Sequence, residues 1–561
     1  MLDRRTFIKG SVVGAAGLTT AGLLSSCTTT PAQSASASAS ASASASASAS
    51  SAASAGNTLP ENERLIREAS RVVYEKDVAD KVKETLEADI VVLGGGAGGL
   101  SAAVRAAELG ASVILCEKAA ALGGSSNGTE GMFGYKSVLQ IEQNVDIPPI
   151  GELIEEECIY SNYRIDTNRW MRFINATAFT VEWLLSQGYV YEKVDVYKPE
   201  LGDFKCFHWW KDGKGSTMME HLEKRARELG VTIMTSTPGV CLMTEGNKVV
   251  GAYAHKDDDN EYIAIKAKAV IEGTGGFGQN FRLVESLTVW DLTYGQTRSF
   301  GCGDGVIMSK DLGAGTYMCA ILPKTGVEGY ATLDDIAIAA CVNPLLYVNN
   351  NGDRFMDEAL YMQHYSALFV NAVISQKKAY VVFDQATVDR FVSGDGIYAG
   401  LRDRLPGHNL PDLQTQIDDS IAKNRGNVFK ANTIKELAGA LGIDPAKMEA
   451  TVNHYNDLCK AGKDTDYLKN PKYLIPLEGG PFYGIRLDPM VTNTIGGLRV
   501  NYNNQVVKPN DEVIPGLYSV GVDSCMLYKE TYNYTMSGGL VSYTLYSGLT
   551  SAQHAFDTCV K

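Results

Sequence analysis

Six consecutive residues near the start of the chain have the spacing that binds a dinucleotide. The run Gly94-Gly95-Gly96-Ala97-Gly98-Gly99 satisfies G-x-G-x-x-G. In this pattern the first glycine permits a tight turn, the second lets a pyrophosphate approach the backbone, and the third lets a helix pack closely on a strand. Glu117 follows the next apolar segment, where its carboxylate can accept hydrogen bonds from ribose hydroxyls. The spacing therefore predicts a dinucleotide site.

The flanking segments have the character of elements that would position this motif. Residues 88–93 are an apolar run typical of a strand, residues 100–109 have the small residues of a tightly packed helix, and residues 111–116 form a second apolar run. This order is that of a Rossmann-type unit, in which the helix N-terminus faces the pyrophosphate. Residues 61–86 mix charged and apolar residues and are predicted to form an amphipathic helix on this unit.

Four later segments complete a recurring order of glycine-rich turns. Together with the first motif they resemble, in sequence, the FAD-contacting segments of the fumarate reductase and succinate dehydrogenase flavoprotein family, over about residues 88–556. The resemblance implies an α/β fold in which a Rossmann-type FAD-binding domain is split by an inserted α+β capping domain. The four segments are 122–126, 269–277, 514–523 and 537–540.

The resemblance also implies which residues bind FAD. Asp523 is expected to bind the ribityl chain, and the helix that opens at Ser537 is expected to point its N-terminus at the isoalloxazine ring, where it would stabilise reduced flavin. Residues 119–136, where covalent members of the family carry a His, contain none, so non-covalent FAD is expected. The expected cofactor-binding residues are Gly94, Gly96, Ala97, Gly98, Gly99, Glu117, Lys118, Gly123, Gly124, Ser125, Ser126, Thr274, Gly275, Gly276, Asp304, Asp523, Ser537, Gly538, Gly539 and Leu540.

The same resemblance sets the expected domain boundaries. The capping domain is expected at 321–492, between two parts of the FAD-binding domain at 61–320 and 493–561. Residues 348–358 match the turn and R-F-x-x-E pattern of the family. Arg354 and Glu358 of this pattern are expected to form a structural pair.

Four cationic or ionisable residues that hold a dicarboxylate in fumarate reductases are absent from the matching positions. The two His and two Arg fall on Leu322, Asn493, Met362 and Met536. A dianion taken out of water without cationic partners costs several kcal/mol per charge. Fumarate and succinate are therefore not expected as substrates, and a neutral or more hydrophobic unsaturated carbonyl compound is.

Neutral acids are expected to replace the lost Arg. The pair Thr531-Tyr532 is similar to a Thr-Tyr pair that 3-ketosteroid dehydrogenases, a related branch, carry before their final glycine-rich helix. In that branch the Tyr hydrogen-bonds the substrate ketone, so Tyr532 is expected to stabilise charge on a carbonyl oxygen. Tyr361 and His364 lie beside Met362 and are the candidate proton donors.

The first 60 residues resemble an export address followed by a linker. Arg4-Arg5 followed by Phe7 and Lys9 resembles a twin-arginine signal, and residues 24–27 resemble a lipobox ending at Cys27. Residues 1–27 are therefore expected to be this signal, with a lipid on Cys27 anchoring the chain to the membrane outside the cytoplasm. Residues 28–60, rich in Ser and Ala, are expected to be a flexible linker.

The resemblance and the expected location together suggest a reaction. Hydride transfer between flavin N5 and a carbon–carbon bond activated by a carbonyl is expected. An exported protein would receive electrons from a membrane-linked cytochrome or quinol chain and reduce a small unsaturated compound as a respiratory acceptor. The reverse dehydrogenation is one alternative. A flavin electron carrier or binding lipoprotein without substrate chemistry is another.

Composition excludes some partners. The formal net charge of −14 argues against a nucleic-acid partner, since phosphate binding needs clustered Lys and Arg. The 11 Cys include no C-x-x-C pair, so no metal site is predicted, although scattered Cys leave an iron–sulfur cluster open.

Overall fold

The computed structural model describes most of the chain after the expected linker. The signal at 1–27, the linker up to residue 59 and the candidate proton donor His364 lie outside the described residues. Along the described part, no helix is long and apolar enough to cross a membrane. The structure describes residues 60–195, 206–289, 296–297, 299–331, 334–363, 366–394, 409–530, 532–533 and 536–561.

An eight-stranded sheet joins residues from both ends of the described chain. Its main order is β16-β17-β9-β1-β2-β6; β7 pairs with β8, and β8 pairs with β9. Strands β17, β9, β1, β2 and β6 run parallel to one another, whereas β16 runs antiparallel to β17. The bounds are β1 Val82–Leu93, β2 Val113–Cys116, β6 Thr232–Met234, β7 Gly239–Glu245, β8 Lys248–Lys256, β9 Glu261–Glu272, β16 Gln505–Val507 and β17 Val513–Ser519.

The predicted strand–helix–strand unit is present, with shifted ends. The helix is α4 (Ala97–Glu108), and the sheet contains both predicted strands. The single helix predicted at 61–86 is wrong. The structure instead has α2 (Glu61–Glu68), α3 (Glu75–Val78) and a 3-10 turn, after which β1 begins at Val82. The reason is that residues 82–88 pair in parallel with β9 and extend the sheet.

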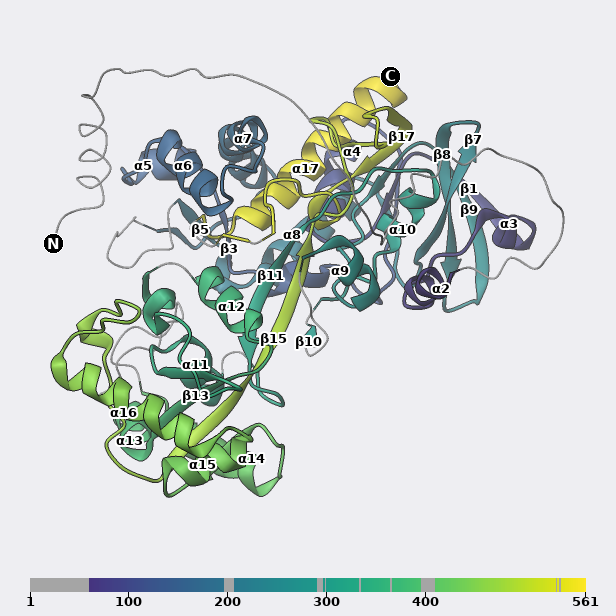
Figure 1. Cartoon of the computed structure of the whole chain (residues 1–561). Coiled ribbons are helices and arrows are strands. Elements are labelled where there is room, and N and C mark those ends of the chain that lie inside the picture. Colours follow the sequence, from purple (N-terminus) through teal and green to yellow (C-terminus); the bar gives the residue numbers. More distant parts are fainter. Residues whose placement is uncertain are drawn as a thin grey trace, which may run out of the picture. The chain divides into compact units, whose positions relative to one another are not determined.

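Helix α17 (Gly539–Ala555) packs directly on α4, so the last helix of the chain supports the first glycine motif (Figure 1). Ser101 of α4 donates a hydrogen bond from Oγ to the Leu545 carbonyl at 3.3 Å. A Cβ on Gly548 would lie 2.3 Å from the Gly98 carbonyl oxygen, so only glycine permits this approach. The split halves of the domain are thus locked together at the helix that follows the motif.

A second sheet of six strands is built around the long strand β15. Residues 482–487 of β15 pair with β13 and its residues 482–485 with β14, whereas residues 488–495 pair with β11 (Figure 1). The expected boundary 320/321 lies at the start of β11, and 492/493 lies inside β15. The bounds are β10 Gln296–Thr297, β11 Ala320–Gly326, β12 Leu346–Asn349, β13 Ala379–Asp384, β14 Val428–Ala431 and β15 Phe482–Ile495.

Helices cover the part of this sheet that carries β12 to β14 and bury two apolar clusters against it. Tyr347, Phe383 and Tyr483 belong to one cluster, and Met448 and Tyr455 to the other. The helices and helical turns are α11 Asp335–Val342, η4 Glu358–Gln363, α12 Ser366–Ser375, α13 Gln385–Ser393, α14 Leu413–Ala422, α15 Ile434–Leu441, α16 Pro445–Ala461 and η5 Pro471–Tyr473.

The expected pair Arg354–Glu358 is present and belongs to a larger buried network. Arg354 donates to both carboxylate oxygens of Glu358, at 2.7 and 2.8 Å, and to Asp464 at 2.6 Å. Lys469 Nζ lies 3.2 Å from Glu358, and its side chain, like those of Glu358 and Asp464, is fully buried. Burial tends to raise the pKa of Asp464, but Arg354 and backbone N–H groups hold it at about 2. Two buried cations are thus matched by two buried anions.

The remaining elements flank the first sheet. A three-stranded sheet of order β3-β5-β4 lies beside α17, and β3 contacts that helix. The elements are η1 Ala79–Lys81, η2 Gly124–Gly128, β3 Gly131–Phe133, α5 Val138–Glu142, α6 Ile150–Tyr160, α7 Thr167–Ser186, β4 Lys193–Val194, β5 Phe207–Trp209, η3 Lys211–Gly213, α8 Gly215–Glu228, α9 Phe281–Leu287, α10 Asp304–Asp311, η6 Gly521–Asp523 and η7 Phe556–Val560.

Candidate active site

A cleft opens where the glycine-rich segments meet, with about 640 Å³ of empty space that includes open solvent. The cleft draws on segments from both parts of the split sheet. Its lining residues are Gly96, Ala97, Gly98, Glu117, Lys118, Gly123, Gly124, Ser125, Ser126, Gly273, Thr274, Gly275, Phe300, Gly301, Asn493, Val520, Gly521, Val522 and Thr544.

The three glycines of the first motif have different surroundings. Gly94 has a φ of +106°, and a Cβ there would lie 2.2 Å from the Gly273 carbonyl oxygen. A Cβ on Gly99 would lie 1.9 Å from the Gly94 carbonyl oxygen, where α4 meets β1. Around Gly96, by contrast, the nearest atom to a Cβ would be 3.9 Å away. The first and third glycines therefore serve folding, whereas the second leaves cleft space beside the backbone, as a pyrophosphate requires.

The acid and the lysine after β2 are held by the protein. Glu117 accepts hydrogen bonds from the backbone N–H groups of Gly95 and Ala119, at 2.7 and 2.8 Å. Lys118 Nζ lies 3.3 Å from the carboxylate of Asp304. Burial alone would lower the pKa of Lys118, but this carboxylate raises it. Glu117 and Lys118 line the cleft; Asp304 is not among the lining residues and instead forms an ion pair with Lys118.

The turn after the acid also faces the cleft. Gly123 has a φ of +114°, and a Cβ there would lie 2.2 Å from the side chain of Asn127. Nothing lies within 4 Å of a Cβ on Gly124. Ser126 Oγ accepts a hydrogen bond from the N–H of Ala97 at 3.2 Å, which fixes the turn against the start of α4. All four predicted residues of this turn, Gly123 to Ser126, line the cleft.

Asp523 shapes the cleft from beneath rather than facing it. It is fully buried, and its carboxylate accepts hydrogen bonds from the N–H and hydroxyl of Thr274 and from the N–H of Gly276. Burial raises the pKa of Asp523, and these donors oppose the rise. Thr274 and Gly275 line the cleft, whereas Gly276 and Asp523 do not. The structure therefore turns the carboxylate toward this loop.

The predicted segment at the start of α17 lies against β3. Gly538 has a φ of +76°, and a Cβ there would lie 2.7 Å from the Cα of Met132. Ser537, Gly538, Gly539 and Leu540 are not among the residues that line the cleft. The helix that Gly538 begins contributes Thr544 to the lining instead.

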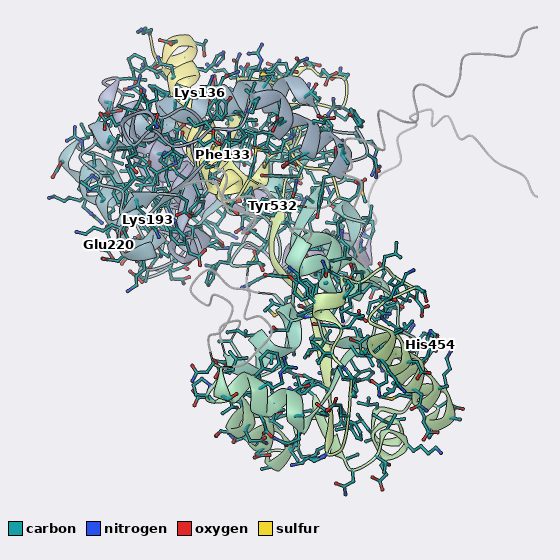
Figure 2. All side chains as sticks on the ribbon, turned by 90° about the vertical axis from the view of Figure 1, so that its left-hand side faces the viewer. Phe133, Lys136, Lys193, Glu220, His454 and Tyr532 are labelled. Carbon is teal, nitrogen blue, oxygen red and sulfur yellow. The ribbon has the colours of Figure 1, made fainter. Side chains whose placement is uncertain are left out.

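The predicted carbonyl ligand Tyr532 lies in an aromatic cluster beside this helix start. It is 5 % exposed, and its ring centroid is 4.8 Å from that of Tyr528. Phe133 of β3 and Met536 belong to the same buried cluster. Figure 2 labels Phe133 and Tyr532 of this cluster. Tyr532 is thus placed with the residues that pack around the N-terminus of α17.

Tyr361 is not brought into that cluster. It packs edge-on against Phe369, with centroids 5.9 Å apart, on the apolar cluster of the capping helices. The structure therefore separates the two candidate tyrosines into different clusters, and His364 lies outside the described residues.

Several lining residues were not predicted. Val520, Gly521 and Val522 directly precede Asp523 and belong to the predicted segment 514–523. Thr544 lies within α17, and nothing in its local sequence marks it. Phe300 and Gly301 precede the G-D pair at 303–304, which was a usable signal for a cleft-facing turn.

The open space at Gly96 leads to a test of cofactor binding. Gly96→Ala adds a methyl group where the backbone borders the cleft, and its φ of −76° suits any residue. We expect FAD affinity to fall by about tenfold or more, or ~1.4 kcal/mol, with unfolding of the apoprotein unchanged.

Whether FAD is covalently attached is tested separately, by measuring the FAD released after acid precipitation. Cofactor that stayed on precipitated wild-type protein would contradict non-covalent attachment.

Gly439→Ala is the matched control for Gly96→Ala. Gly439 lies in α15, and a Cβ there would meet no atom within 4 Å. This variant should bind FAD as the wild type does. Equal FAD affinity of Gly96→Ala and Gly439→Ala would show that Gly96 does not border the cofactor.

Comparison with known proteins places the chain in a family. Residues 89–535 match the family model described as the FAD binding domain. The chain is 36 % identical to a vinyl phenol reductase of Lactiplantibacillus plantarum, over 83 % of this chain and 96 % of that protein.

Solved structures share the fold. The open conformation of a flavocytochrome c3 fumarate reductase matches with a TM-score of 0.59 and 22 % identity, over 86 % of this chain and 81 % of that chain. A 3-ketosteroid dehydrogenase from Rhodococcus jostii RHA1 matches with a TM-score of 0.64 and 19 % identity, over 85 % of this chain and 99 % of that one. The chain therefore belongs to the FAD binding domain family, within the fumarate reductase and succinate dehydrogenase flavoproteins, and FAD is its cofactor.

Proposed function

We propose that this FAD-dependent oxidoreductase reduces a conjugated carbon–carbon double bond in a neutral or hydrophobic compound, and not in fumarate. The observation that carries the proposal is the identity of the residues at the four dicarboxylate positions: Leu322, Met362, Asn493 and Met536. Not one of them can carry a positive charge. The likeness to a vinyl phenol reductase supports a neutral substrate, because a vinyl phenol has no carboxylate. An unsaturated carbonyl compound or a vinyl group conjugated to a phenol meets these requirements.

Moving a charged group out of water costs free energy. A carboxylate that leaves water loses several kcal/mol of hydration unless cations and donors replace it. The buried cations Arg354 and Lys469 cannot compensate a substrate carboxylate, because they already pair with Glu358 and Asp464. Lys118 is likewise held by Asp304. A neutral substrate avoids this cost.

Bound FAD supplies the hydride, from N5 of its ring. The protein must then provide a hydrogen-bond donor where negative charge develops and a proton for the second carbon. Tyr532 is our candidate for the first task, since a phenol donates without the desolvation cost of a cation. Tyr361 and His364 remain candidates for the second.

We propose that the electrons come from a membrane-linked cytochrome or quinol chain, and that the substrate serves as a respiratory acceptor. This follows from the expected twin-arginine signal and from a lipid on Cys27. Cys27→Ala should release the protein from the membrane fraction while export continues. Unchanged membrane attachment of this variant would contradict lipid anchoring at Cys27.

Product analysis tests the reaction. The chemically reduced holoenzyme is mixed without oxygen with a vinyl phenol, a neutral enone or fumarate, and the saturated product is measured by its mass gain of two hydrogens. We expect saturation of a neutral compound and a much slower reaction of fumarate. A comparable rate on fumarate would refute the substrate argument.

The same experiment separates the alternatives. A flavin carrier would saturate none of the compounds. A dehydrogenase would instead oxidise the saturated compound when an artificial electron acceptor is supplied, and would do so faster than it catalyses reduction.

Tyr532→Phe tests the donor. Loss of one donor of this kind typically costs about 10²–10³ in rate. Substrate-driven reoxidation of reduced flavin should slow by about that factor at unchanged FAD content. Tyr543→Phe, a buried tyrosine of the same cluster, is the control and should keep its rate. A Tyr532→Phe rate above about a third of wild type would exclude this role and direct attention to Tyr534 and the capping helices.

A further inference from the structure

Phe300 is an exposed aromatic residue at the edge of the cleft. It is 60 % exposed, and it is the aromatic member among the described residues that line the cleft. Single exposed apolar residues are common on protein surfaces and need no explanation by themselves. Cofactor sites, however, are lined largely by apolar and aromatic side chains. An exposed ring at the border of the cleft that carries the dinucleotide motif is therefore a candidate contact for the cofactor.

The backbone on both sides of Phe300 is held in place. The Ser299 carbonyl accepts a hydrogen bond from the side-chain amide of Gln279 at 2.7 Å, and the Gly301 carbonyl accepts one from the N–H of Gln279 at 3.0 Å. A Cβ on Gly301 would lie 2.4 Å from the Gly275 carbonyl oxygen, so this turn packs directly on a loop that also lines the cleft. The backbone that carries the ring is thus ordered before a ligand binds, which lowers the entropic cost of binding.

Lys118 joins this turn to the end of the cleft where the adenosine half of FAD is expected. Its Nζ donates a hydrogen bond to the Phe300 carbonyl at 3.0 Å. The preceding residue, Glu117, is the acid after β2, and in a Rossmann-type unit this acid accepts hydrogen bonds from the adenosine ribose. The pyrophosphate is expected at the start of α4. Adenine is attached directly to that ribose, so the base should lie on the side of the cleft that carries Lys118 and Phe300.

We propose that Phe300 is a ligand of the adenine base, which stacks on the Phe300 ring when FAD binds. A nucleobase and an aromatic side chain both have an extended π face, and stacking between them requires no specific hydrogen bond. The charge beside the turn is already compensated, because Lys118 pairs with Asp304 at 3.3 Å. This proposal rests on FAD binding and not on the choice of substrate, so its outcome is independent of the proposed reaction.

Phe300→Ala tests the proposal through FAD affinity and apoprotein stability, neither of which requires turnover. The dissociation constant for FAD, measured by flavin fluorescence, should increase by about tenfold or more, the usual value of one base stacked on an aromatic ring. The thermal unfolding temperature of the apoprotein should stay the same, because the residue is largely exposed. A lower unfolding temperature with unchanged FAD affinity would make Phe300 a structural residue and overturn the proposal.

Phe179→Ala is the matched control. Phe179 lies in α7, is 51 % exposed and is not among the residues that line the cleft, so this variant should keep wild-type FAD affinity. Two further variants separate stacking from simple apolar cover. Phe300→Tyr retains an aromatic face and should bind FAD as the wild type does, whereas Phe300→Leu retains apolar bulk alone and should bind FAD more weakly. Wild-type affinity of Phe300→Leu would exclude a stacking role.

An FAD analogue that lacks the adenine base identifies the half of the cofactor that Phe300 contacts. The wild type should bind this analogue at least about tenfold more weakly than FAD. Phe300→Ala should bind the analogue as the wild type does, because the partner of the ring is then already absent and the two losses do not add. If Phe300→Ala weakened the analogue as much as it weakens FAD, Phe300 would contact another part of the cofactor, and the proposal would be wrong.

Discussion

The organisation of this protein depends on a single constraint: a charge that is buried must be compensated where it lies. Asp523 shows it most clearly. Its fully buried carboxylate accepts three hydrogen bonds from Thr274 and Gly276, residues far away in the sequence. By doing so it holds the C-terminal segment 520–523 against the loop at 274–276. Both segments contribute to the cleft wall, so compensation of one carboxylate assembles the two halves of the cofactor site.

The same constraint applies to the buried ion pairs of the expected capping domain and, under the proposed function, to the choice of substrate. Arg354 and Lys469 are buried there, but Glu358 and Asp464 neutralise them within the core. Burial lowers the pKa of Lys469, and Glu358 opposes this shift. These cations stabilise the fold and are not available to a ligand. Under the proposed function, a neutral compound takes the place of the dianion because the four matching positions carry no positive charge.

Sequence reasoning succeeded where a residue's role depends on its neighbours in the chain. Gly94, Gly96 and Gly99 have the surroundings that the motif requires, and the turn at 123–126 lies in the cleft as predicted. It failed where residues far away in the sequence determine the local structure. Residues 82–86 were assigned to a helix because their partner strand β9 lies far along the chain. The partners of Asp523, which was predicted to bind the ribityl chain, are the equally remote Thr274 and Gly276, and nothing in its local sequence marks them.

Ligand binding to the oxidised holoenzyme, followed through the change in flavin absorbance, tests the charge argument most directly. A neutral vinyl phenol and fumarate are titrated under identical conditions, so neither electron supply nor proton transfer enters the result. The account predicts that the neutral compound binds at least about a hundredfold more tightly, a difference of ~2.7 kcal/mol. Fumarate binding as tightly as the vinyl phenol would contradict it, because a buried dianion would then have found compensation that the four neutral positions cannot supply.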